Sequence, residues 1–231
     1  MVHAGGRPRK LTTEDIIRAG RQIGLAQLSL NAVASRLSVT PAALYRHVAN
    51  RWELERMVGE DILAELILTD DPQQDTAQHL LSVGLQLRAF ILDHPGLAAY
   101  VQTLFPRGAS GRRLLSMEAT ALGKRGYSVE AALVLSSAVA SVAIGYAATE
   151  ELQRTRGEGY ATQRNAALQD INTDTELAEA HQQLPDITPD EYVRMWLGAA
   201  VAGFIAAAPP GRSVSEIRNA LHAATEGVNH G

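Results

Sequence analysis

The stretch Leu28–Leu54, LSLNAVASRLSVTPAALYRHVANRWEL, decides the fold of the first part of this 231-residue chain. Ser29 is a good N-cap, and the apolar residues behind it recur at the i, i+3, i+4 and i+7 spacing of one helical face. Thr40 and Pro41 open a second helix, because a proline at the first helical position loses no hydrogen bond. The stretch therefore predicts two short helices joined by a tight turn at Ser38–Val39.

The second helix is predicted to have two different faces. Its inward face carries Pro41, Leu44 and Val48, and Asn50 then begins the next helix with Glu53 as a variant of the capping box. The outward face combines small residues with hydrogen-bonding and cationic ones, which is typical of the recognition element of a helix-turn-helix. These outward residues are Ala42, Ala43, Tyr45, Arg46 and His47.

At these residues, and over about residues 12–58, the chain resembles the TetR family of transcriptional regulators. The segment TPAALYRHVANRWEL is similar to the family's recognition-helix pattern. Ser38 stands where the family usually has glycine, and Arg51 replaces the usual lysine while keeping its charge. The resemblance implies a dimer that binds a near-palindromic operator in double-stranded DNA. It also implies repression relieved by a small-molecule effector, although no residue excludes an activator.

The resemblance assigns two kinds of DNA contact to individual residues. Arginine with guanine and asparagine with adenine are the favoured pairs at base edges, and alanine methyl groups can meet thymine methyl groups. A basic amino-terminal arm can in addition follow phosphates or enter a minor groove. Phosphate contact falls on Tyr45, His47 and Arg51, base-edge contact on Asn31, Thr40, Ala42, Ala43 and Arg46, the arm supplies Arg7, Arg9 and Lys10, and the helix starts Ser29 and Pro41 complete the predicted surface.

Charge is distributed unevenly along the chain. Nine of the 21 Lys and Arg residues but only four of the 25 Asp and Glu residues lie before residue 59, which makes this part basic and the remainder acidic. That asymmetry favours a DNA-reading part joined to one that does not touch DNA. There is no cysteine, which excludes disulfides and thiolate metal sites, and residues 1–10 contain no apolar secretory segment. We expect a cytoplasmic protein.

Helical periodicity continues through the chain without any sustained strand alternation, so the predicted fold class is all-α. Residues 1–11 are expected to form a flexible basic arm, and residues 12–69 a three-helix DNA-binding head whose first helix is capped by Thr12. A long helix from Asn50 to about Leu68 is expected to connect this head to a larger helical body, residues 70–231, that binds the effector and dimerises. Within the body, the polar residues 154–190 are expected to form mostly loop, with a helix near 175–183. The expected helix breakers there are Gly157, Gly159, Pro185 and Pro189.

Arg88 is the most unusual charge in the predicted body, because it shares a helical stripe with Leu81, Leu85 and Leu92. A charge among leucines must reach solvent, pair with an opposite charge or bind something anionic. Pairing with Glu118 or Glu150 is the simpler interpretation. The functional interpretation places a small effector among Arg88, Tyr100, Met117, Tyr146 and Glu150.

Two uncharged stretches, Ala131–Thr149 and Met195–Gly211, carry small residues at every fourth position. The first is long enough to span a membrane, but its alanine- and serine-rich composition argues against a span, and we expect no membrane partner. Small residues in one row let two helices approach closely, and two such helices fit a two-fold homodimer interface. The rows are Ser137, Ser141 and Gly145 in the first stretch and Ala199, Gly203 and Ala207 in the second.

Enzymatic motifs are not evident in the sequence. The seven histidines form no ligand-spaced pair on a helix face, so we expect surface histidines, no metal site and no cofactor. There is neither a Gly-x-Ser-x-Gly motif nor a glycine-rich phosphate loop, and the prediction is therefore not an enzyme. The alternative to a ligand-responsive regulator is an architectural DNA-binding dimer without an effector.

Overall fold

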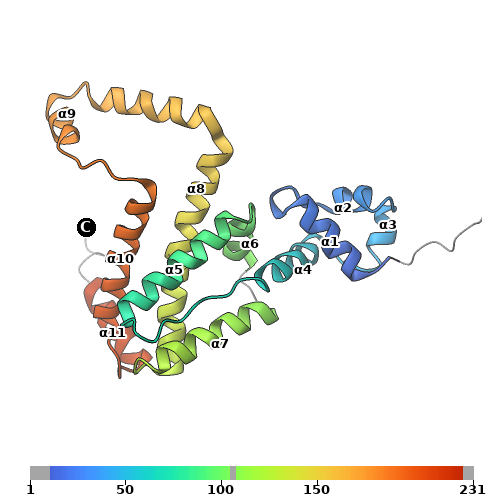
Figure 1. The fold of residues 1–231 in the computed structure, drawn as a ribbon, viewed down its shortest axis with the longest axis horizontal. Helices are drawn as coiled ribbons and strands as arrows, with labels where there is room; N and C mark the ends of the chain where they lie inside the picture. The colour runs from blue at the N-terminus through green and yellow to red at the C-terminus, as the bar shows by residue number, and fades with distance from the viewer. Residues whose placement is uncertain (1–10, 105–107, 226–231) are drawn as a thin grey trace, which may run out of the picture. The chain divides into compact units, whose positions relative to one another are not determined.

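The computed structural model describes residues 11–104 and 108–225, and these residues contain eleven α-helices, one short 3₁₀ helix and no strand (Figure 1). The all-α prediction is confirmed. The chain divides into two compact units. The first unit takes the chain as far as Leu66 together with His94–Arg112, and the second takes Ile67–Asp93 and the chain from Arg113 onward.

The first unit begins with four helices whose starts follow from local sequence. Capping side chains accept hydrogen bonds from backbone N–H groups of the first helical turn, which otherwise lack partners. These caps are Thr12, Ser29, Thr40 and Asn50, as the sequence predicted. The elements are α1 (Thr13–Ile23), η1 (Leu25–Gln27), α2 (Leu30–Arg36), α3 (Pro41–Leu44) and α4 (Arg51–Leu63).

The predicted connector helix is shorter than expected, because α4 ends at Leu63 and not near Leu68. The first unit also contains α6 (Leu97–Leu104), which packs on α4 and η1. Tyr100 of α6 covers Gly59 so closely that a Cβ atom built there would lie 2.5 Å from the ring. The first unit thus includes residues 94–112, which the expected boundary at residue 69 placed in the body, and this packing between distant segments has no local signature in the sequence.

The second unit is built around α5 (Thr76–Leu92), α8 (Val129–Ile171) and α10 (Pro189–Ala207), which pack against one another. Leu80, Leu135 and Leu197 are buried to 0–2% exposure where the three helices meet. Gly84 of α5 lets them approach, since a Cβ there would lie 2.9 Å from Leu197 Cδ2. The other helices of the region are α7 (Ala109–Gly123), α9 (Thr175–Gln182) and α11 (Val214–Thr225), and α7 runs from the first unit into the second.

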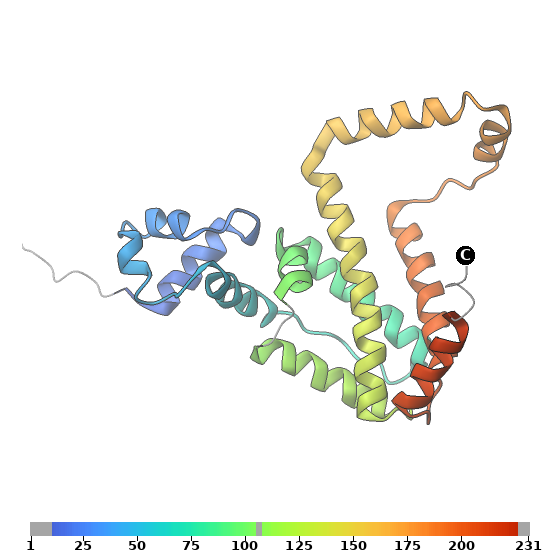
Figure 2. The same cartoon turned by 180° about the vertical axis from the view of Figure 1, so that it is seen from behind.

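The predicted loop at residues 154–190 is largely wrong, because α8 continues as helix to Ile171. Gly157, expected to break the helix, does so locally, because its φ of 54° and ψ of −140° are non-helical and it lies at a kink between two helical segments. Beyond it the helix changes direction sharply and leads to α9 (Figures 1 and 2). Pro189, also expected to be a breaker, is the first residue of α10, where a proline costs no hydrogen bond.

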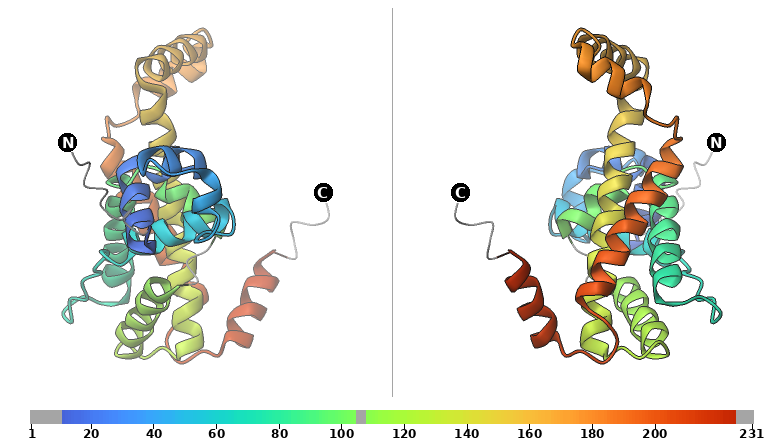
Figure 3. Two further views of the ribbon diagram at one scale, coloured as in Figure 1. Left: turned by 90° about the vertical axis from the view of Figure 1, so that its right-hand side faces the viewer. Right: turned by 90° about the vertical axis from the view of Figure 1, so that its left-hand side faces the viewer.

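By length and composition alone, α8 could cross a membrane, since one 18-residue window has a mean hydropathy of 1.8. In the structure, 39% of that window is buried within the protein. The same helix packs along α5 and α10, and its first part lies beside α10 in the view of Figure 3. These contacts are those of a core helix in a helical unit, in agreement with the sequence interpretation.

Candidate nucleic-acid interface and effector region

The turn between α2 and α3 has the geometry of a helix-turn-helix. Ser38 has φ 53°, in the left-handed region that glycine adopts most readily, and this is the position where glycine was expected. The N–H of Val39 donates to the carbonyl of Ala34, and Thr40 Oγ1 accepts from the N–H of Ala43. Leu44 and Val48 are 0% and 1% exposed, so the predicted inward face holds at these two positions.

Pro41 does not belong to that inward face. It is exposed, and the prediction that it packs inward is wrong because α3 is only four residues long and turns a different side to the first unit's core. The chain continues as a turn through Tyr45–His47, where the N–H of His47 donates to the carbonyl of Leu44. A tighter i→i+3 bond of this kind is common where a helix ends.

The outward face of α3 and its turn presents polar and cationic side chains to solvent. Tyr45 is 55% exposed, and Arg46 and Ala42 are exposed as well, while Ala43 and His47 are half-buried. On α2, Asn31 is exposed and Ser29 is half-buried, and Thr40 is exposed at the start of α3. The predicted DNA surface is thus accessible at most of its positions. Arg7, Arg9 and Lys10 lie outside the described residues.

Arg51, the first residue of α4, is held by one carboxylate. Its Nε donates to Glu55 Oε1 at 2.7 Å, one helical turn along, and its side chain is 67% exposed. An exposed i, i+4 pair of this kind contributes only about 0.3–0.5 kcal/mol, so it orients the guanidinium more than it stabilises the helix. No described residue accepts from the terminal Nη atoms of Arg51. These donors can therefore take a phosphate.

Arg88 of α5 is paired, as the simpler interpretation of the sequence expected. Its Nε and Nη2 donate to both oxygens of Glu150 at 2.6 and 2.7 Å, and Nη2 also donates to Asp190 at 2.7 Å. These hydrogen bonds, the one to Glu150 above all, raise the pKa of Arg88 against the effect of burial. The ion pairs join α5, α8 and α10, and they leave Arg88 less able to receive an anionic ligand.

Two aromatic residues that the sequence analysis did not select, Tyr192 and Trp196, follow Asp190 on α10 of the second unit. Tyr146 of α8 meets Tyr192 of α10 edge to face with ring centroids 6.4 Å apart, and Tyr192 meets Trp196 at 6.2 Å. Tyr192 and Trp196 are 46% and 48% exposed. Their i, i+4 spacing on one helix was a usable signal, whereas the approach of Asp190 to Arg88 had none in the sequence.

The five predicted effector residues do not all belong to one unit. Tyr100 is in the first unit against Gly59, whereas Arg88, Met117, Tyr146 and Glu150 are in the second. Met117 lines a shallow groove of 260 Å³ that also contains Leu68 and Lys124. Tyr100 was grouped with the other four residues by its residue type alone, because the sequence gives no sign that α6 packs on α4.

The expectation of surface histidines is wrong for His79. This side chain is fully buried in the second unit, with Nε2 3.2 Å from Glu118 Oε2 and Nδ1 3.3 Å from Asp70 Oδ1. Burial opposes ionisation of Asp70, but hydrogen bonds from Arg125 and Lys124 outweigh it and hold its pKa below the usual value. Glu118, offered as an alternative partner for Arg88, pairs with His79 instead.

The two predicted rows of small residues remain uncovered within one chain. A Cβ atom added to Gly145 or to Gly203 would meet nothing within 4 Å. Ser141, Ala199 and Gly203 are exposed. Ser137, Gly145 and Ala207 are half-buried. A second helix surface could therefore approach both rows without displacing a side chain of the same chain.

Comparison with known proteins points to one class. No family model matches the chain. An HTH-type transcriptional regulator from Saccharopolyspora erythraea is 26% identical over 157 residues, which is 66% of this chain and 66%, slightly under two thirds, of the relative's own length.

Solved structures resemble the chain over most of its length. ActR from Streptomyces coelicolor in complex with actinorhodin is 23% identical with a TM-score of 0.71, covering 86% of this chain and 99% of ActR. A TetR variant from Acinetobacter baumannii AYE in complex with minocycline is 19% identical with a TM-score of 0.62, covering 86% and 99%. The resemblance noted for residues 12–58 is thereby confirmed, and the chain has the fold of TetR-family regulators.

Proposed function

We propose that the protein is a cytoplasmic, ligand-responsive transcriptional regulator, acting as a repressor that binds a near-palindromic operator as a dimer. The observation that carries the proposal is the surface formed by α3 and the start of α4. There Leu44 and Val48 are buried while Tyr45, Arg46 and Arg51 face solvent. A surface that buries its apolar side chains and exposes its hydrogen-bond donors suits contact with phosphates and base edges.

A small-molecule effector is the second part of the proposal. ActR and the TetR variant have the same fold and were solved with actinorhodin and minocycline, and this similarity supports a bound effector in the second unit. The proposed region contains Arg88, Met117, Tyr146 and Glu150, with Tyr192 and Trp196 added by the aromatic contacts. The protein is not proposed to be an enzyme.

Dimerisation is the third part. Two reading surfaces must lie about one DNA turn, roughly 34–36 Å, apart to occupy successive major grooves. We assign the dimer contact to the rows on α8 and α10, which end in Gly145 and Ala207 and which open onto solvent in the single chain.

Site selection from randomised duplexes tests the DNA-binding part. The selected sites should be inverted repeats, and binding should weaken steeply with salt because most contacts reach phosphate. Arg46→Ala should cost about 1–3 kcal/mol and relax base preference at one position per half-site, whereas Arg51→Gln should weaken all sequences alike. Arg18→Ala, which removes the same charge from α1, is the control. An Arg46→Ala protein with unaltered preference would contradict the assignment of Arg46 to a base.

Reciprocity tests the effector part and separates it from the architectural alternative. Native mass spectrometry of the purified protein identifies a co-bound molecule, whose affinity is then measured with and without saturating operator. A coupling of about 1–3 kcal/mol should weaken each ligand roughly 5–150-fold in the presence of the other. Equal effector affinity in both conditions would leave a DNA-binding dimer without induction.

A further inference from the structure

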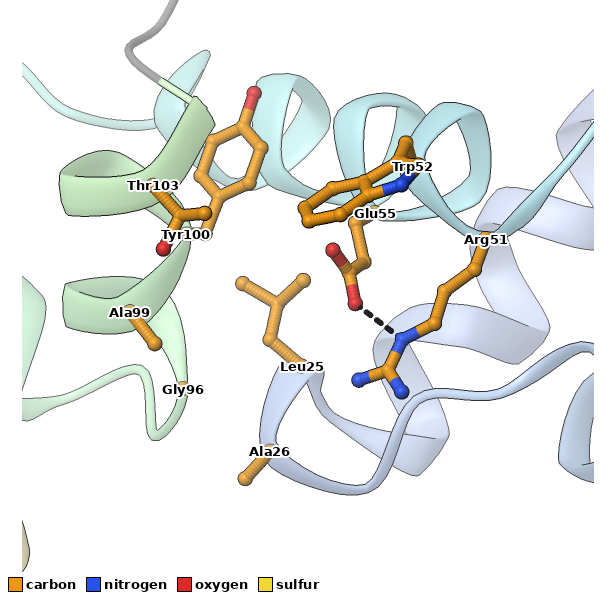
Figure 4. A pocket seen from close by; sticks show the side chains of 9 residues that line it. All are labelled: Leu25, Ala26, Arg51, Trp52, Glu55, Gly96, Ala99, Tyr100 and Thr103. Carbon is orange, nitrogen blue, oxygen red and sulfur yellow. Dashed lines mark hydrogen bonds and ion pairs between the residues drawn. The ribbon is translucent and has the colours of Figure 1, made fainter.

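The first unit contains a groove that the proposed DNA contact does not explain. It has a volume of about 430 Å³ and lies between α4, η1 and the residues of α6 (Figure 4). Arg51, Trp52 and Glu55 of α4 form one side, and Leu25 and Ala26 of η1 lie across from them. The third side consists of Gly96, Ala99, Tyr100 and Thr103. This volume lies within the range of small-molecule sites, about 300–1,000 Å³.

The groove offers an aromatic surface to an occupant. Trp52 is 57% exposed although it lines a concave surface, and its ring lies beside the opening with Leu25 opposite (Figure 4). A single exposed tryptophan needs no explanation, but one that forms the wall of a groove exposes apolar area that a flat molecule can cover. The apolar contact therefore favours a planar aromatic body.

The same groove offers a positioned cation at one end. Glu55, whose side chain is 17% exposed, holds Arg51 by its Nε atom and so fixes the direction of the guanidinium. The opposite edge carries Nη1 and Nη2, for which no described residue serves as acceptor. Paired N–H groups in a fixed plane match the two oxygens of a carboxylate. A cationic ligand would be repelled by the charge of Arg51, and a neutral ligand without an acceptor would leave both N–H donors bonded to water.

From these contacts we infer that the groove binds a small aromatic carboxylate, with the ring on Trp52 and the carboxylate on the Nη edge of Arg51. Because one guanidinium edge cannot serve two anions, an occupied groove and a bound DNA phosphate compete for Arg51. The binding site stands on the first unit alone, whereas this competition rests on the proposed function.

The test uses 2-naphthoate as the probe and the indole N–H cross-peaks of the full-length ¹⁵N-labelled protein as the readout. The chain has two tryptophans, so Trp52→Phe assigns the Trp52 cross-peak, and the Trp196 cross-peak reports separately on binding to the proposed effector region of the second unit. Addition of 2-naphthoate should shift the Trp52 cross-peak saturably, with its own midpoint, whether or not that of Trp196 also moves. The uncharged 2-naphthamide should bind about three- to tenfold more weakly, the range expected for a partly exposed charge-assisted contact.

Two substitutions within the groove should act in opposite directions. Arg51→Gln should weaken 2-naphthoate about three- to tenfold and leave 2-naphthamide unchanged, while Glu55→Gln should strengthen 2-naphthoate about two- to threefold because it removes the competing carboxylate. Arg18→Gln and Glu14→Gln, which make the same charge changes in an exposed pair on α1, should change neither affinity.

The outcomes separate the two proposals. If neither groove variant alters 2-naphthoate binding, or if the Trp52 cross-peak moves with protein concentration and not with probe, the inferred site is wrong. In the latter case a second copy of the chain covers the groove. The DNA-binding proposal is untouched by either result. Saturating duplex DNA should weaken 2-naphthoate, and unchanged affinity there would overturn the competition while the groove remained a binding site.

Discussion

Gly59 in α4 and Gly203 in α10 both lie inside helices, but their surroundings are opposite. The ring of Tyr100 covers Gly59, whereas the space around Gly203 is open to 4 Å. The same contrast holds between Gly20, covered by Val58, and Gly145 of α8. Gly59 and Gly20, like Gly84 of the second unit, thus let helices of one chain pack closely. Gly145 and Gly203 lie instead on surfaces that one chain leaves free, which is where we expect a second copy.

The largest loss of stability should follow from adding a side chain at Gly59, the glycine that Tyr100 covers. Gly59→Ala places a methyl group about where the Tyr100 ring lies, and overpacking of this kind costs about 1–3 kcal/mol even after the gain in helix propensity. Urea denaturation of a Trp196→Phe protein, followed by Trp52 fluorescence, measures the loss in the first unit.

Gly145→Ala is the counterpart in the second unit, where unfolding is followed by Trp196 fluorescence in a Trp52→Phe protein. Since its methyl group meets nothing in the chain, it should change stability by no more than about 1 kcal/mol, in the stabilising direction. Equal losses for the two variants would contradict the contrast between covered and open glycines.

The second prediction concerns the hydroxyl group of Tyr100, the residue that covers Gly59. Burial, and after it the negative charge of Glu60, raises the pKa of Tyr100 to about 12 from its usual value of 10.0. The folded state therefore keeps the phenol proton more tightly than the unfolded chain does. This contribution is complete below pH 10 and is lost as the pH rises through 12, by about 1–2 kcal/mol in all once screening by solvent is allowed for.

Tyr100→Phe has no proton to lose and should show a flatter decline over the same range. Urea midpoints measured at intervals from pH 8 to pH 12 compare the two proteins. Parallel curves would show that ionisation of Tyr100 does not limit the alkaline stability of the first unit.

The smallest effect on the folding of one chain is expected for Gly203→Leu. This variant tests the surface of α10 that one chain leaves uncovered. A side chain added at an exposed helix position should alter unfolding of the separated chain by less than about 1 kcal/mol, in the stabilising direction. If α10 meets a second copy there, the dimer should instead dissociate at least tenfold more readily, because a close crossing does not accept added volume. Sedimentation equilibrium decides between these outcomes, and a tight Gly203→Leu dimer would place the interface elsewhere.

The features that could be predicted from the sequence are those decided within one helical turn. The caps at Thr12, Ser29, Thr40 and Asn50 are of this kind, because each side chain bonds to the backbone three residues on. The left-handed conformation of Ser38 agrees with the glycine that the TetR family usually has at this position. A proline can either interrupt a helix or begin one, and the sequence alone does not decide between the two. Pro189 was expected to interrupt helical structure, but it is the first residue of α10.

Features that depend on partners distant in sequence could not be predicted. The ring nitrogens of the buried His79 lie beside the carboxylates of Asp70 and Glu118, and Glu118 lies 39 positions further along the chain. Arg88 was identified as a charge that needed a partner, yet its third contact, with Asp190, spans 102 positions. The packing of α6 on α4 belongs to the same class, and it removed Tyr100 from the effector region in which residue type had placed it.

The chain passes between the two units three times, near residues 66, 93 and 112. The first unit is therefore not a continuous piece of sequence, and a hybrid regulator cannot be made by joining two proteins at residue 69. Such a transplant would leave α6 behind, with Gly59 bare and the groove beside Trp52 missing one wall. A transplant that keeps the first unit of this chain intact must therefore include residues 94–112 together with the amino-terminal helices.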